Sequence, residues 1–163
     1  MISWHRLWIL DAVTDTESEP DCDATLELVL AELERREPIF HRREFGTTRE
    51  DFDRLTDVNF WETGASGRRY SREHVWAVLG QRYASDPTGR HDSDWTTSAF
   101  ELREIASNTY LLTYLLEQHD RLTRRTTLWQ RREGDWKILY HQGTLVSGSV
   151  SDTTPHRQVL NSE

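Results

Sequence analysis

One glutamate, Glu62, lies where a carboxylate could act as a general base. It falls near the end of a run at 57–63 that is typical of a strand. Alternate side chains on a strand share a face, so we expect Val58 and Phe60 to face the interior together with Glu62, and Phe60 to help line a pocket there. A carboxylate in such a place has a raised pKa and can accept a proton. The alternative is that Glu62 accepts hydrogen bonds from the Gly/Ser turn at 64–67 or pairs with an arginine.

A second candidate base is His141, in the run Trp136–Thr144. An imidazole exchanges its proton near neutral pH. Both alternating faces of this run mix polar and apolar residues, so alternation alone does not show which set faces a pocket. We therefore keep Gln142 and Thr144, on the face opposite His141, as candidate ligand-binding residues. The alternative for His141 is a structural hydrogen bond beside a close backbone approach at Gly143.

Hydroxyl and aromatic side chains supply the other candidates. Tyr114 shares a strand face with Tyr110 and Leu112, and a tyrosine hydroxyl in an apolar pocket can polarise a carbonyl group. Thr126 and Trp129, on another strand, are candidates for lining the same pocket. The alternative for all three is packing in the core, with the hydroxyl of Tyr114 satisfied by a neighbour.

Metal and nucleotide chemistry find no support in these residues. The single cysteine, Cys22, excludes a cysteine-based zinc site and an internal disulfide. The seven histidines form no helical pair of the kind that binds zinc. The chain has no glycine-rich phosphate loop, and the turn at 64–67 lacks the spacing of a nucleophile elbow. We expect no metal and no cofactor.

Three helices are expected before the main sheet. The first, at 24–37, has apolar residues spaced as one helical stripe and ends near Pro38. Thr48 begins a capping box that opens the second helix. Ser71 caps the third, at about 72–84.

The strands predict the fold class. A strand at 57–63 pairs with a brief one at 68–70, and four long runs follow the last helix, at about 95–105, 108–118, 122–132 and 135–145. Short turns join the long runs, which favours an antiparallel meander. Helices early and a meander late describe an α+β fold in which helices pack on one face of a curved sheet. Such a sheet forms a cone that encloses a pocket.

Three segments resemble a known family. They are Asn59-Phe-Trp-Glu-Thr-Gly-Ala-Ser-Gly67, Arg125-Thr-Thr-Leu-Trp129 and Trp136-Lys-Ile-Leu-Tyr-His-Gln-Gly-Thr144. In this order they are similar to motifs of the DUF4440 branch of the nuclear-transport-factor-2-like (NTF2-like) superfamily, except that Thr126 and Thr127 replace two serines. The resemblance covers about 24–146. It implies a cone of three N-terminal helices on a strongly curved antiparallel sheet, and a homodimer.

The superfamily includes ketosteroid isomerase, polyketide cyclases and dehydratases, and also binding and assembly modules without activity, so the resemblance implies the fold more firmly than the chemistry. We expect a pocket that binds a small organic molecule. An enzyme would use cofactor-free acid–base chemistry, with Glu62 or His141 as the base and Tyr114 or Thr126 as the donor to a developing oxyanion. The alternative is a non-catalytic dimeric binding or assembly module.

Charge and composition limit the partners. The chain carries 28 acidic and 20 basic residues, a formal charge of −8, which disfavours nucleic acid. Adjacent arginines recur, either as a site for an anionic ligand or as solvated surface. No apolar run approaches the roughly 20 residues that span a bilayer, so we expect no membrane partner.

The ends of the chain are expected to lie outside the domain. Polar residues interrupt the apolar N-terminus and no signal-peptide pattern is present, so we expect a cytoplasmic protein. We divide the chain into an N-terminal extension at 1–22, the domain at 23–146 and a polar tail at 147–163. Trp4 and Trp8 in the extension are expected to dock on the domain or on a second subunit.

Overall fold

The structure, a computed structural model, describes residues 22–89 and 94–147. Its helices are α1 (Cys22–Glu34), α2 (Arg49–Leu55) and α3 (Arg72–Ser85), with two short 3-10 turns, η1 (Ile39–His41) and η2 (Arg43–Phe45). Its strands are β1 (Thr56–Thr63), β2 (Arg69–Ser71), β3 (Trp95–Ala106), β4 (Thr109–Gln118), β5 (Arg121–Arg132) and β6 (Asp135–Leu145). The rest of the predicted extension and tail, with Trp4 and Trp8, lies outside the described residues.

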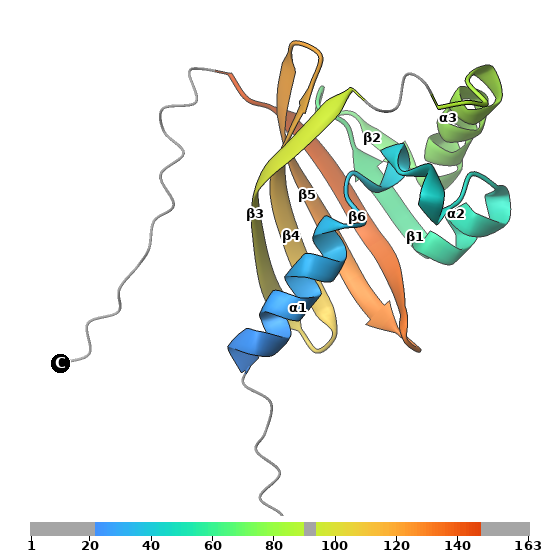
Figure 1. The fold of residues 1–163 in the computed structure, drawn as a ribbon. Coiled ribbons are helices and arrows are strands. Elements are labelled where there is room, and N and C mark those ends of the chain that lie inside the picture. Colours follow the sequence, from blue (N-terminus) through green and yellow to red (C-terminus); the bar gives the residue numbers. More distant parts are fainter. Residues whose placement is uncertain (1–21, 90–93, 148–163) are drawn as a thin grey trace, which may run out of the picture.

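The six strands form one sheet in the order β2-β1-β6-β5-β4-β3. Strands β3 to β6 are the predicted antiparallel meander. Strand β1 pairs with β6 in parallel, which the sequence did not predict. Figure 1 shows α1 crossing in front of the curved meander, while α2 and α3 gather beside β1 and β2. The molecule is thus an α+β cone of helices on a curved, unclosed sheet.

The expected helix signals are present. Thr48 and Asp51 form a reciprocal capping box at the start of α2, and the hydroxyl of Ser71 accepts a hydrogen bond from the N–H of His74 at the start of α3. In α1 the apolar stripe is buried through Val29 and Leu33. None of the described helices is both long and apolar enough to cross a membrane.

A β-bulge in β6 changes which side chains face the helices. The register of β6 with β5 shifts by one residue at Leu139. An extra residue in one strand reverses the alternation beyond it. Trp136 and Ile138 therefore face the interior before the bulge, and His141 and Gly143 face it afterwards.

The first half of β1 is also irregular. Its register with β6 shifts there, and Asp57 accepts a hydrogen bond from the N–H of Asn59 at 2.8 Å. Val58 is 80% exposed, whereas Phe60 is 2% exposed. The expectation that Val58 faces the interior is wrong, because the shift interrupts the alternation on which it depended. Beyond the shift the alternation is regular, and Glu62 follows Phe60 on the inner face.

Candidate functional site

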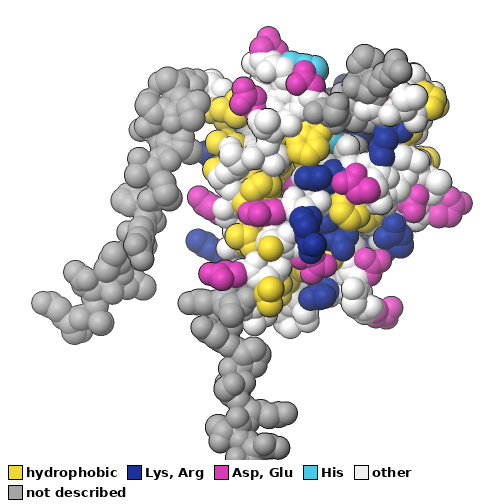
Figure 2. All heavy atoms as spheres, viewed as in Figure 1, with side chains coloured by type: hydrophobic (Ala, Val, Ile, Leu, Met, Phe, Trp, Pro, Cys, Tyr) yellow, Lys and Arg dark blue, Asp and Glu magenta, His cyan; other side chains and the backbone are white. Residues whose placement is uncertain are grey.

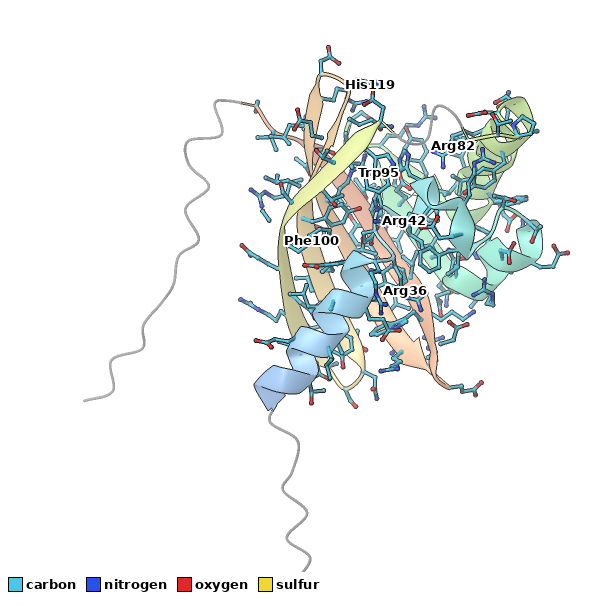
Figure 3. All side chains as sticks on the ribbon, in the orientation of Figure 1. Arg36, Arg42, Arg82, Trp95, Phe100 and His119 are labelled. Carbon is cyan, nitrogen blue, oxygen red and sulfur yellow. The ribbon has the colours of Figure 1, made fainter. Side chains whose placement is uncertain are left out.

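A cavity of about 320 Å³ opens between the inner face of the sheet, helix α3 and the turn η1. Its α3 wall is largely apolar, and Figure 3 shows Arg82 between that helix and the sheet. The charged and polar side chains that line it are Glu37, His41, Glu62, Tyr70, His74, Arg82, Tyr114, Arg125 and His141. All three predicted catalytic residues, Glu62, Tyr114 and His141, are therefore brought to one cavity.

Glu62, on β1, is a half-buried carboxylate that lines the cavity. It makes neither a hydrogen bond nor a contact ion pair with any residue that the structure describes. The neighbouring turn uses its own groups, because the N–H of Gly64 donates to Arg68 O and that of Gly67 to Gly64 O. Burial raises the pKa of Glu62, and the positive charges of Arg125 and Arg82 oppose this rise. The alternative in which the turn holds Glu62 is not what the structure contains.

His141 has both ring nitrogens engaged. Nε2 lies 3.3 Å from Nη1 of Arg125, and Nδ1 lies 3.0 Å from Oγ1 of Thr127. A guanidinium only donates hydrogen bonds, so Nε2 is the acceptor and Nδ1 carries the proton that is donated to Thr127. Burial and the charge of Arg125 lower the pKa of His141 to about 3. This geometry fits a neutral structural histidine better than a general base.

Tyr114 is fully buried, and its hydroxyl is already used. The hydroxyl donates a hydrogen bond to Oε2 of Glu37 at 3.0 Å. The ring stacks on Phe100 with centroids 5.0 Å apart. Burial and the Glu37 carboxylate raise the pKa of Tyr114 well above its ordinary value. Tyr114 thus lines the cavity, but its hydroxyl is directed at a protein carboxylate.

That carboxylate, Glu37, is a residue that the sequence did not single out. It is 0% exposed. Its Oε2 accepts from the N–H of Ile39 at 2.9 Å as well as from Tyr114, and its Oε1 accepts from Nε1 of Trp129 at 3.1 Å. The hydroxyl of Thr127 is a further partner. Burial raises the pKa of Glu37, and these hydrogen bonds oppose the rise.

The sequence missed Glu37 because the first helix was expected to continue to residue 37. Helix α1 ends at Glu34 instead, and the N–H of Glu37 reaches back to Leu33 O at 3.2 Å. A glutamate followed by Pro38 and two apolar residues was the available signal. This pattern is consistent with a glutamate that follows the end of a helix and is buried in the interior.

Arg125 joins this network from the cavity side. Its Nε donates to Oγ1 of Thr123 at 3.0 Å, and its Nη1 donates to His141. Gly143 lies opposite Arg125 in the sheet register. A Cβ at Gly143 would lie 3.2 Å from Nη1 and 3.3 Å from Cζ of Arg125. The close approach predicted at Gly143 is present, and it makes room for the guanidinium.

Arg36 and Arg42, which come from other adjacent pairs, lie outside the cavity and pair with nearby carboxylates. Arg36 pairs with Glu32 at 3.4 Å, and Arg42 pairs with Glu44 at 3.3 Å. In Figure 2 basic and acidic side chains intermingle on the visible face. Arg125 differs from these arginines because it lines the cavity.

Three predicted ligand-binding residues lie on the opposite face of the sheet. Thr126 pairs in register with Gln142, whose Oε1 accepts from the hydroxyl of Tyr140 at 2.6 Å and whose Nε2 donates to Oγ1 of Thr144 at 3.2 Å. The expectation that Thr126, Gln142 and Thr144 line the cavity is wrong. Beyond the bulge at Leu139, the inner positions of β6 are His141 and Gly143 and the outer ones Gln142 and Thr144.

Phe60 and Trp129 lie on the inner face but are buried in the core beneath the cavity. Trp129 acts on the site through its hydrogen bond to Glu37. Within 22–89 and 94–147, no group of three or more His, Cys, Asp or Glu side chains is placed to hold a metal ion. Among the described residues, the site combines a carboxylate without a hydrogen-bond partner, a guanidinium with unused N–H groups and a network of hydrogen bonds within the protein.

Solved structures of low sequence identity share this architecture. A protein of the DUF3225 family from Pectobacterium atrosepticum is 17% identical, with a TM-score of 0.57 over 78% of this chain and 94% of that chain. An NTF2-like protein of unknown function from Pseudomonas aeruginosa is 12% identical, with a TM-score of 0.52 over 72% and 99%. The fold is NTF2-like. No protein-family model and no curated protein matches the sequence.

Removing the Glu37 carboxylate should destabilise the NTF2-like fold strongly. Glu37→Ala leaves the N–H groups of Ile39 and Trp129 buried without their acceptor, so we expect the free energy of unfolding to fall by about 2–4 kcal/mol. Urea denaturation measures the change. Glu117→Ala, at an exposed position of β4, is the control and should change stability little. Equal losses of unfolding free energy in the two variants would contradict a stabilising role of the Glu37 hydrogen bonds.

The raised pKa of Glu62 should make stability depend on pH. A carboxyl group whose pKa is raised by folding stabilises the protein below its ordinary pKa, near 4.5, and loses this contribution as the pH rises through the folded-state pKa. Glu62→Gln removes the titration. The unfolding free energy of the variant, relative to that of the wild type, should therefore increase from pH 4.5 towards neutrality, as measured by urea denaturation. The unfolding free energy of a Glu117→Gln control should depend on pH as that of the wild type does. If the unfolding free energy of Glu62→Gln also showed this same dependence on pH, the raised pKa of Glu62 would be refuted.

Proposed function

We propose that the cavity binds a small organic molecule and that Glu62 exchanges a proton with it. The observation that carries this proposal is the environment of Glu62. Its carboxylate faces the cavity, has a raised pKa and makes no hydrogen bond or contact ion pair among the described residues. A group with these properties is suited to general acid–base catalysis.

The neighbouring charges fit a proton abstraction from carbon. Glu62 would take a C–H proton next to a carbonyl group, and the electron pair would move onto the carbonyl oxygen as an enolate. Arg125 and Arg82 are near enough to affect the pKa of Glu62, and their positive charges would stabilise the enolate. Isomerisation, cyclisation and dehydration of carbonyl compounds can each begin with this step. The three motifs that resemble the DUF4440 branch support that branch as the family.

The rival proposal is a non-catalytic binding or assembly module. The observation that favours it is the hydrogen-bond network of Glu37, Tyr114 and His141, in which polar groups of the cavity wall serve the scaffold. Such a module would bind its ligand in the same cavity without proton transfer. Deuterium exchange into bound ligands separates the two proposals.

Hydrogen–deuterium exchange provides the test without a known product. Small ketones and keto acids would be incubated with the protein in D₂O, and loss of α-proton signals would be followed by proton NMR. We expect at least one ligand to exchange faster with the wild type and to lose this acceleration with Glu62→Gln, because the amide cannot accept the proton. Glu117→Gln should behave as the wild type. Equal exchange by the wild type and Glu62→Gln would overturn the role of Glu62, and ligands that bind without exchange would favour the rival module.

We also propose a homodimer formed through the outer face of the sheet. No described helix covers this face, which carries Leu128, Tyr140 and Trp61. The rings of Trp61 and Tyr140 are in contact, with centroids 4.8 Å apart. Half-buried apolar and aromatic side chains on one open face are typical of a subunit interface.

A charge on this face should separate the subunits. We expect Leu128→Asp to convert a dimer into a monomer, because a carboxylate would be buried without a partner in the interface. Analytical ultracentrifugation measures the mass. Leu28→Asp, at a 73% exposed position on α1, is the control and should leave the mass unchanged. A wild-type monomer at high protein concentration would rule out the dimer.

A further inference from the structure

We infer that the ligand of this cavity carries a carboxylate, and that the guanidinium of Arg125 binds it. The inference deepens the proposed function and rests on it for one point, that the cavity is a ligand site. It does not depend on proton transfer by Glu62. It rests on the hydrogen bonds, the charge and the support of Arg125.

Within the described part of the chain, the hydrogen bonds of Arg125 use only two of the five N–H groups of its guanidinium. Nε donates to Thr123 and Nη1 donates to His141. A guanidinium has five N–H donors in a planar fork, so Nη2 and the second N–H of Nη1 remain. Among the residues that the structure describes, none accepts a hydrogen bond from Nη2. Arg125 lines the cavity, so these remaining N–H groups are available to a ligand there, and two adjacent N–H groups of a guanidinium bind a carboxylate through two parallel bonds.

The charge of Arg125 also lacks a close partner. It is half-buried, and no acidic side chain in the described part of the chain lies at ion-pair distance from it. Glu62 attracts it only from farther away. By contrast, Arg49 and Arg72 in the helices form contact ion pairs with acidic side chains. A partly buried cation costs free energy unless it is paired, and a ligand carboxylate would supply the pair.

The support of Arg125 holds it ready for such a ligand. Because Gly143 has no side chain, the guanidinium can lie close to the backbone of β6. The acceptor Nε2 of His141 is fixed because Nδ1 is bonded to Thr127, which in turn bonds to the buried Glu37. The orientation of the fork is therefore set before the ligand arrives. Such preorganisation lowers the entropy cost of binding.

Two acids and their neutral amides test the inference directly. The probes are benzoate with benzamide and butyrate with butyramide, which differ within each pair only in charge and in one hydrogen-bonding group. Dissociation constants would be measured by isothermal titration calorimetry, with chemical-shift changes in NMR spectra of the labelled protein to locate the site. We expect at least one acid to bind the wild type about tenfold or more tightly than its amide does, as a charge-assisted pair of hydrogen bonds implies.

Arg124 provides a matched control, because it is the next residue in β5 and is exposed on the opposite face. Arg124→Gln and Arg125→Gln change the net charge equally. We expect Arg125→Gln to lose the preference for the acid over the amide and Arg124→Gln to retain it. Arg125→Lys keeps the charge but not the fork, so its preference should be intermediate. Equal acid binding by Arg124→Gln and Arg125→Gln would overturn the inference.

The outcomes separate this inference from the proposed function. If the amides bind the cavity as tightly as the acids, the carboxylate inference fails and the ligand cavity stands. If none of the four probes binds, both fail. If acids bind through Arg125 but no ligand exchanges its proton, the inference stands and the catalytic role of Glu62 fails. Should Arg125→Gln not fold, the acid–amide preferences of Arg125→Lys and of the wild type decide between these outcomes.

Discussion

The structure depends on a carboxylate that is removed from water and held by hydrogen bonds. Glu37 lies just beyond α1, and its partners come from the following turn, from β4 and from β5. Burying a carboxylate is costly unless its oxygens are satisfied. The chain can meet this requirement only when the segment after α1 is seated against the inner face of the sheet. The same seating brings η1 over the sheet and forms one wall of the cavity.

The network that starts at Glu37 divides the polar residues of the cavity into two groups. Thr127, His141 and Nη1 of Arg125 are joined to it in sequence, so these hydrogen-bonding groups are directed at other protein groups. Glu62 and the remaining N–H groups of Arg125 make no hydrogen bond among the described residues, and both residues line the cavity. The first group fixes positions, and the second is what a ligand would meet. Perturbed pKa values occur in both groups, so burial and partners, rather than the pKa alone, distinguish them.

The sequence predicted the fold closely because the fold follows from local signals. Caps at Thr48 and Ser71 and tight turns between alternating runs placed the helices and the meander. The site was harder to predict. The bulge at Leu139 leaves no mark in the alternation, yet it decides that His141, and not Gln142, faces the cavity. The role of Glu37 could not be predicted, because it depends on where α1 ends and on partners that are distant in the sequence.

The proximity of Glu62 and Arg125 links binding to chemistry. Without a ligand, the positive charge of Arg125 lowers the pKa of Glu62 against the effect of burial. The negative charge of a carboxylate bound to Arg125 would offset that positive charge, so the pKa of Glu62 would rise further. An ionised carboxylate of higher pKa is a stronger base. Glu62 would therefore be strongest as a base when the cavity holds an acid, so the group that recognises the ligand would also activate the group that reacts with it.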